Sequence, residues 1–376
     1  MSERVWTAAD FDYELPEELI AQVPTAERGA SRMMVINRDV IVSEARPKAG
    51  RSRTTSAATD RSPSTSRALS ARCAQDDKFA NIVSLIPPHD LLVINTTRVR
   101  RARLLGTRPS GGAAEVLLIH PSTDDSWIAM GKPGRAMIPG RRIMLDANVS
   151  IETVEILDDN MRRVKFIGAT AADAIARFGR IPLPPYITRE PTTDDDSRYQ
   201  TVYAEREGSV AAPTAGLHFT AEILDALRAK GVAVASLDLE VGPGTFRPME
   251  DGDVTAHAMH SEHFEIPPAL AVAVAACRAR DGSVWAVGTT VVRALESAAR
   301  NDGTVTPGAA DTRLLITPEF QFRVVDHLIT NFHLPKSTLL MLVAAFAGYD
   351  ATMAAYRHAV EQRYRFYSYG DAMCVL

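Results

Sequence analysis

The sequence predicts an α/β protein: a layered α/β main domain with an inserted small antiparallel β-barrel-like domain. Three observations predict it. In the C-terminal half, helical patterns alternate with short apolar strands, as in layered α/β domains. Between residues 100 and 168, short apolar segments follow one another, mostly separated by Gly, Pro, Asp-Asp or Asp-Asn, which is typical of small antiparallel domains. A chain of 376 residues is also long for a single core.

We therefore assign residues 1–99 and 170–376 to the main domain and residues 100–169 to the insertion. The helices expected after the insertion are Thr170–Phe178, Ala221–Lys230, Pro268–Arg280, Arg293–Ala299, Thr338–Ala347 and Ala351–Tyr364. The strands expected between those helices are Val232–Val241, Val284–Val287, Thr312–Ile316 and Phe322–Val325.

Residues 43–77 contain Ser, Thr, Ala and Arg with almost no large apolar side chain. Such a segment buries too little surface to offset its ordering entropy, and we predict a disordered loop. It also concentrates charge. The stretch Arg46–Arg72 carries a net charge of +6. Because the net charge of the whole chain is −4, the other residues together carry −10. A nucleic-acid contact must therefore come from local basic patches.

The composition, with 46% hydrophobic and 23% charged residues, is that of an ordinary globular protein. Met1–Trp6 lacks the apolar core of a signal peptide, and the apolar stretch Leu339–Gly348 is too short to span a bilayer. The cysteines Cys73, Cys277 and Cys374 suggest neither a disulfide framework nor a zinc site. We expect a cytoplasmic protein without a membrane partner.

Two glycine-containing stretches look like site loops. In Gly208–Thr220, small residues around Thr214, Gly216 and His218 allow a ligand to approach the backbone, and the helix that follows can bind an anion. An ordinary strand-to-helix connection explains the composition equally well. The second stretch, Val241–Pro248, includes Gly244 and Thr245, and a lone Gly-x-Gly is weak evidence for nucleotide binding.

Two further stretches bring together groups that transfer protons or bind polar ligands. His257–His263 holds three histidines and a glutamate, but not at the spacing of the helical zinc motif, so we favour proton transfer by His260 and Glu262 over metal binding. Asp326–Thr338 places an amide, an imidazole and a cation beside a helix start. These three groups are Asn331, His333 and Lys336.

Aromatic and basic residues suggest contacts with RNA. Tyr364–Met373 mixes aromatic rings, including Tyr369, with Arg365 and Asp371; such clusters stack on bases but are more often core residues with an ion pair. A basic stripe follows the strand that ends near Asn95. It consists of Arg98, Arg100, Arg101 and Arg103, and Arg108 follows further along the chain. Such a stripe suits either phosphate binding or a solvated charged face.

Several long motifs occur in one order along the chain. They are Phe11–Leu19, Gly179–Ile187, Arg198–Ala204, Gly208–Thr220, Val287–Thr290 with Arg293–Ser297, Leu328–Val343 and Tyr364–Met373. Together they resemble the S-adenosylmethionine:tRNA ribosyltransferase-isomerases of queuosine biosynthesis over nearly the whole chain. The resemblance implies a β-barrel-like domain inserted in an α/β domain, as the residue patterns also predict.

The resemblance further implies S-adenosylmethionine as a co-substrate that donates ribose, and tRNA as the partner. The ribosyl group is transferred and isomerised onto a 7-aminomethyl-7-deazaguanine base at the wobble position, with release of adenine and methionine. No metal is implied, and we expect a monomer. The acid–base candidates are His218, His260, Glu262 and His333. The substrate-binding candidates are Tyr199, Tyr203, Thr214, Gly216, Gly244, Thr245, Arg293, Asn331, Lys336, Tyr369 and Asp371.

Two positions depart from the family pattern. Thr96 stands where the family usually has an aspartate, and Glu240 stands where it usually has a histidine. Two alternatives therefore stay open: a divergent member acting on a different amine acceptor, and a catalytically inactive paralogue that binds tRNA or S-adenosylmethionine. A conventional methyltransferase is disfavoured, because no strand-linked Gly-x-Gly opens a doubly wound sheet at the N-terminus.

Overall fold

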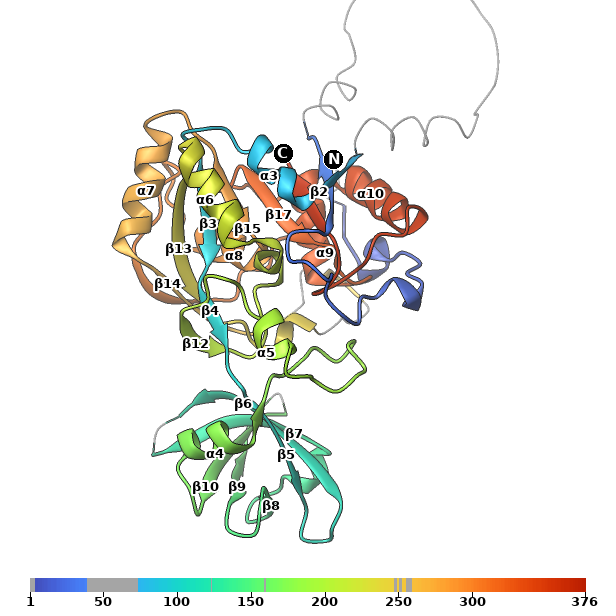
Figure 1. The fold of residues 1–376 in the computed structure, drawn as a ribbon, viewed down its shortest axis with the longest axis vertical. Coiled ribbons are helices and arrows are strands. Elements are labelled where there is room, and N and C mark those ends of the chain that lie inside the picture. Colours follow the sequence, from blue (N-terminus) through green and yellow to red (C-terminus); the bar gives the residue numbers. More distant parts are fainter. Residues whose placement is uncertain are drawn as a thin grey trace, which may run out of the picture. The chain divides into compact units, whose positions relative to one another are not determined.

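The computed structural model describes residues 4–38, 74–122, 124–158, 160–246, 249, 252–254 and 259–376. The chain divides into two compact units (Figure 1). Unit 1 comprises Met1–Asn95, Thr214–Leu237 and Arg247–Leu376, and unit 2 comprises Thr96–Pro213 and Asp238–Phe246. Large sheets and helices confirm the predicted α/β class.

A mixed sheet forms the centre of unit 1. Its strand order, within the described residues, is β16 (Gly308–Thr312), β14 (Glu262–Ile266), β13 (Ala233–Leu239), β3 (Leu91–Asn95), β15 (Val284–Val287), β17 (His327–Asn331), β18 (Ala372–Val375), β1 (Arg32–Ile36) and β2 (Ala74–Lys78). The strands β13, β3, β15 and β17 run parallel. Both β3 and β15 are buried along their whole length, which agrees with their continuous apolar sequences.

Helices pack on this sheet. They are α3 (Ile82–Leu85), α6 (Ala221–Lys230), α7 (Pro268–Arg278), α8 (Thr289–Ser297), α9 (Thr338–Ala347) and α10 (Tyr349–Glu361). The 3₁₀ helices of unit 1 are Ala8–Phe11, Glu17–Leu19, Phe79–Asn81 and Thr214–His218. Among the described helices none is by itself long and apolar enough to cross a membrane. Taken together, α9 and α10 would be long and apolar enough, but the pair is bent by 118°.

Unit 2 is built on an antiparallel sheet. The order of its described strands is β11 (Gly179–Arg180), β5 (Arg103–Thr107), β6 (Ala113–Pro121), β7 (Ser126–Lys132), β10 (Arg162–Ile167), β9 (Ser150–Ile156) and β8 (Arg142–Met144), with a further β5–β8 pairing. Alternate residues of β6, namely Ala114, Val116 and Leu118, enter the core, as the period of a half-buried strand requires.

Shorter elements complete unit 2. They are β4 (Thr97–Val99), which pairs in parallel with β12 (Arg206–Ser209), the helices α4 (Ala171–Phe178) and α5 (Asp195–Arg198), and the 3₁₀ helices Gly134–Ala136 and Pro243–Phe246. The unit is larger than the segment 100–169 expected for the insertion. One reason is that Ile175 and Phe178 of α4 pack on the core of the antiparallel sheet. Another is that β11 pairs with β5.

Three predictions of secondary structure need correction. Residues 43–73 of the predicted loop lie outside the described residues, but Ala74–Asp77 belong to β2, which pairs with β1. The predicted strand Thr312–Ile316 is wrong, because β16 ends at Thr312.

The predicted strand Phe322–Val325 is also wrong, and the buried carboxylate of Glu296 explains why. Its oxygens accept hydrogen bonds from the backbone N–H groups of Arg323 (2.9 Å), Val324 (3.0 Å) and Val325 (2.9 Å). These donors therefore have partners without a neighbouring strand. The strand that does join the sheet, β17, begins two residues later at His327.

Replacing Glu296 with alanine is expected to destabilise unit 1 by about 3–5 kcal/mol, because buried N–H groups would lose their acceptor. Glu296→Gln keeps one acceptor oxygen and should cost less. Thermal and urea unfolding of the full chain would measure both, with Glu361→Ala, at an exposed helix position, as the control. Equal stability of Glu296→Ala and the control would contradict a stabilising role for the hydrogen bonds that Glu296 accepts.

Candidate active site

The carboxyl ends of β3, β15 and β17 meet at one edge of the unit 1 sheet, because these strands run parallel. The next strand of this sheet after β3, namely β13, pairs with β3 on one side, whereas β15 and then β17 lie on the other side. Open α/β sheets bind ligands at such a divergence, outside the carboxyl ends of the strands. The candidate site therefore lies beside Asn95, Gly288 and Asn331, which end or follow these strands.

The start of α8 forms one wall of this edge. Gly288 precedes the helix with φ 95°, a conformation that favours glycine, and its N–H donates to the carbonyl of Ile329 at 2.7 Å. A Cβ at Gly288 would lie 3.6 Å from Ala215, so the 3₁₀ helix Thr214–His218 lies against the helix start. The hydroxyl of Thr290 is buried and has no hydrogen-bond partner among the described residues. This helix start therefore offers N–H groups and a hydroxyl to an anion.

Asn331, at the end of β17, is fixed from two sides. Its Nδ2 donates to the carbonyl oxygen of Tyr367 at 3.0 Å and lies 3.1 Å from Nε2 of His218. The carbonyl can only accept, so it determines which way the amide faces. The oxygen Oδ1 is then left buried, without a partner among the described residues. It is an acceptor available to an N–H group of a ligand.

His218 holds this amide as a neutral ring. Nε2 accepts from Asn331, so the proton lies on Nδ1, which contacts Oγ of Ser31 at 2.7 Å. Burial, with smaller contributions from the cations Arg28 and Arg365, lowers the pKa of His218 to about 3. Both ring nitrogens are engaged and the ring is a weak base. The geometry therefore fits positioning of Asn331 better than proton abstraction.

His333, another acid–base candidate, is also buried. Its Nε2 lies 2.8 Å from Oγ1 of Thr330, and its backbone N–H donates to the Tyr356 hydroxyl at 3.0 Å. Burial lowers the pKa of His333 to about 3. These contacts fasten the segment after β17 to α10.

Glu262 and Arg293 form a buried ion pair between β14 and α8, with both side chains 6% exposed. Nε of Arg293 also donates to the carbonyl of Leu314 at 3.1 Å.

His260, just before β14, has a partly exposed side chain. His257 lies outside the described residues, and across the part of the chain that the structure describes no group of three or more His, Cys, Asp or Glu is arranged to hold a metal.

Several predicted binding residues have structural contacts in unit 1. The carboxylate of Asp371 accepts from the backbone N–H groups of Arg32 (2.9 Å) and Arg365 (2.8 Å), and burial raises its pKa. Lys336 forms a half-exposed ion pair with Asp12 at 3.4 Å. Tyr369 is buried. Thr214 and Gly216 lie in the 3₁₀ helix beside α8.

The remaining predicted residues belong to unit 2. Tyr199 is fully buried and Tyr203 is partly buried. Gly244 and Thr245 lie in the 3₁₀ helix Pro243–Phe246, and the side chain of Thr245 is not among the parts that the structure describes. Of the basic stripe, three members line one cavity: Arg98, Arg100 and Arg101. The fourth, Arg103, is instead paired with Glu115 (2.9 Å) and Glu190 (3.2 Å).

Sequence reasoning missed Thr290, Ser31 and Tyr367 as site residues. The run Gly288–Thr290 directly follows a buried strand and opens a helix, a pattern that could have singled out Thr290. Ser31 and the carbonyl of Tyr367 gave no such signal, because only the tertiary fold brings them to His218 and Asn331.

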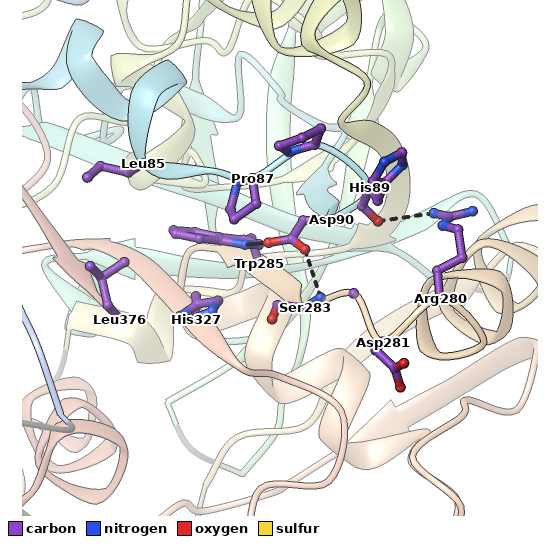
Figure 2. A pocket seen from close by; sticks show the side chains of 12 residues that line it. Leu85, Pro87, His89, Asp90, Arg280, Asp281, Ser283, Trp285, His327 and Leu376 are labelled. Atoms are coloured by element: carbon purple, nitrogen blue, oxygen red, sulfur yellow. Dashed lines mark hydrogen bonds between the residues drawn. The ribbon is translucent and has the colours of Figure 1, made fainter.

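A cavity of about 440 Å³ lies at the opposite edge of the unit 1 sheet, among Asp90, Trp285 and His327 (Figure 2). The oxygens of Asp90 accept from the N–H of Ser283 (2.9 Å) and from Nε1 of Trp285 (2.8 Å). The ring of His327 stacks on Trp285, with centroids 4.2 Å apart. These contacts join the amino ends of β3, β15 and β17, so we assign them to stability.

The fold is that of an α/β protein whose candidate site lies at the carboxyl ends of the parallel strands in a mixed sheet. The chain belongs to the family described as queuosine biosynthesis protein, whose model matches residues 8–48 and 54–375.

Individual relatives are similar over nearly their whole length. S-adenosylmethionine:tRNA ribosyltransferase-isomerases from Cupriavidus pinatubonensis and Symbiobacterium thermophilum are each 47% identical, over 98% of this chain and 98% and 99% of theirs. The crystal structure of an S-adenosylmethionine tRNA ribosyltransferase from Thermotoga maritima is 34% identical. It matches 98% of this chain and 100% of that one, with a TM-score of 0.52.

Unfolding should become easier in acid because His218 and His333 are buried as neutral rings. Their folded pKa of about 3 lies below the unfolded value of 6.5, so the unfolded chain binds more protons between these values. The free energy of unfolding should therefore fall as pH drops below about 6.5, by up to about 1.4 kcal/mol per pH unit for each histidine.

Urea unfolding between about pH 7 and pH 5 would measure this slope. His333→Gln should reduce the slope relative to the parent, whereas His120→Asn, at an exposed position, should leave it unchanged. An identical slope in the parent and His333→Gln would show that His333 is not buried in its neutral form.

Proposed function

We propose that this protein transfers and isomerises the ribosyl group of S-adenosylmethionine onto 7-aminomethyl-7-deazaguanine at the wobble position of tRNA, releasing adenine and methionine. The observation that carries the proposal is the 45–47% identity, over 98% of the chain, to relatives named for this activity. The carboxyl edge of the unit 1 sheet supports it, because its free polar groups suit a zwitterionic substrate.

The methionine end of S-adenosylmethionine carries a carboxylate and an ammonium group. The start of α8 suits the carboxylate, through its first N–H groups and the buried hydroxyl of Thr290. Oδ1 of Asn331 suits an N–H donor, either this ammonium or an amine of the reacting bases. Leaving such groups buried and unpaired would cost free energy, and a bound substrate removes that cost.

The reaction needs groups that move protons. The sulfonium acidifies the neighbouring C5′ protons, one of which a base removes, and the acceptor amine must lose a proton to attack. We assign proton transfer first to His260, because its side chain is partly exposed to a substrate whereas those of His218, Glu262 and His333 are buried. Holding both substrates together lowers the barrier further.

We also propose that the antiparallel sheet of unit 2 is barrel-like. The pairing of Thr107 in β5 with Met144 in β8 links the two ends of the strand series β5-β6-β7-β10-β9-β8. A sheet closed in this way has no free edges along that series. We further propose that the protein acts as a monomer in the cytoplasm, without a metal, and that its partners are tRNA and S-adenosylmethionine.

A second candidate is action on a different amine acceptor. The residue that favours it is Glu240, which replaces the usual histidine and lies close to Gly208, where a Cβ would be 2.9 Å from the carboxylate. A carboxylate at this position changes the charge beside the signature stretch that begins at Gly208.

Purified protein, S-adenosylmethionine and tRNA carrying the 7-aminomethyl-7-deazaguanine base should release adenine in step with a mass gain on the tRNA, read by mass spectrometry. The same tRNA lacking the aminomethyl group is the control and should gain no mass. Intact S-adenosylmethionine with bound tRNA would refute the proposal, and would favour another acceptor or an inactive paralogue.

Thr290→Val should raise the KM for S-adenosylmethionine about tenfold, because valine keeps the shape of threonine but removes the hydroxyl that we assign to the carboxylate. Steady-state adenine release would measure it. Thr352→Val is the matched control, since Thr352 is another buried helical threonine, bonded to the carbonyl of Val343 at 3.4 Å. An unchanged KM in a stable Thr290→Val protein would remove Thr290 from the substrate site.

A further inference from the structure

A cavity of about 620 Å³ in unit 2 has two chemically different walls. One wall is basic and consists of residues in and just after β4. The other wall is apolar and comes from β7 and α4. The residues that carry the argument are Arg98, Arg100 and Arg101 on the first wall, and Trp127, Ile175 and Ala176 on the second.

Among the arginines that line this cavity, Arg100 has an N–H group available to a ligand. Its Nη2 makes a long contact, 3.4 Å, with the carbonyl of Glu207, and its guanidinium lies 5.0 Å from the centre of the Trp127 ring. Its Nη1 is buried and has no hydrogen-bond partner among the described residues. A buried guanidinium N–H is costly to leave unpaired and suits an oxyanion.

The two neighbouring arginines already have partners. Arg98 donates to the carbonyl of Ala204, and Arg101 forms an ion pair with Asp196. The carboxylates of Asp196 and Glu207 also line the cavity. The site is therefore not a general basic surface. It has one available guanidinium, and besides the two lining carboxylates that of Glu240 also acts on Arg100, which suits a single phosphate better than an extended anion.

The apolar wall is shaped for a flat group. Ala172, Ile175 and Ala176 follow the i, i+3, i+4 spacing of one face of α4, and the two alanines are exposed. Their small side chains leave room above the helix. The indole of Trp127 is partly exposed beside them and provides an aromatic surface for a base.

The backbone of the basic wall is held rigidly. The side-chain amide of Gln200 both accepts from the N–H of Val99 (2.9 Å) and donates to its carbonyl (2.8 Å). The N–H of Arg100 donates to the carbonyl of Ser209 at 2.9 Å. Arg100 is thereby presented on a fixed backbone, so little ordering entropy remains to be lost on binding.

We propose that this cavity binds one nucleotide of the tRNA, with its phosphate on Arg100 and its base against Trp127 and the apolar face of α4. A nucleotide combines an anion with a flat ring, which matches the two walls. RNA-binding sites use the same pairing of arginine with an aromatic ring. The inference rests on the proposed function for the identity of the RNA, but not on ribosyl transfer itself.

Fluorescence anisotropy with labelled tRNA, over a series of salt concentrations, tests the proposal. Ala176→Glu places a carboxylate in the cavity at an exposed helix position and should weaken tRNA binding about tenfold. Arg100→Gln should weaken it similarly and reduce the slope of log affinity against log salt by about one phosphate contact. Ala276→Glu, the same change at an exposed position of α7, is the matched control and should bind as the parent does.

Because Arg100→Gln loses a partly buried cation, photocrosslinking provides a test that keeps the arginine. A benzophenone amino acid at position 176 should crosslink to the tRNA, and one at position 276 should not. Parent-like affinity of a folded Ala176→Glu protein, or no crosslink at position 176, would overturn the proposal. Weakened binding by the variants together with intact S-adenosylmethionine in the parent would instead refute only the proposed ribosyl transfer.

Discussion

The parallel pairing of β3 with β15 and of β15 with β17 determines where the groups of the candidate site lie. Parallel strands deliver their carboxyl ends to one edge, and the residues that follow them are therefore neighbours although they are far apart in sequence. Gly288 and Asn331 meet there for this reason. The segment Thr214–His218 joins them, because it precedes α6 and packs against β17 and the start of α8.

Carboxylates fasten the segments around these strands. Asp90 joins the starts of β3 and β15, and Asp326 accepts from the N–H of Val284 and from Arg278, both at 2.7 Å. Glu296 and Asp371 act in the same way on the segment before β17 and on the segment before β18. Each carboxylate accepts charge-assisted hydrogen bonds from N–H groups of these segments, so irregular segments can be buried beside the sheet.

Much of the fold could be predicted from the sequence because its signals are local. The bounds of α6, α9 and β15 agree with the apolar periodicity and the caps at Thr220 and Ser337. The run of short antiparallel strands in unit 2 was also predicted, since turn residues separate them. The segment Phe322–Val325 has the apolar residues of a strand, but its backbone N–H groups are bonded by a distant glutamate that no local pattern reveals.

The candidate site could be predicted only in part. Asn331 and His218 stand in recognisable stretches, but their mutual contact and the neutral state of the histidine depend on burial by the whole fold. Residue types indicated proton transfer for Glu262 and the family resemblance implied it for His218, whereas their partners Arg293 and Ser31 lie elsewhere in the sequence.

The place of β18 in the sheet has a consequence for the order in which the protein forms during synthesis. This strand, Ala372–Val375, lies between β17 and β1, so β1 and β2 join the rest of the sheet only through a strand that follows them at a long distance in the sequence. Such long-range closure is slow, and until it occurs β1 has only β2 to pair with. The edge of β1 that pairs with β18 would therefore remain open while the other strands of unit 1 assemble, and an open strand edge is prone to aggregation.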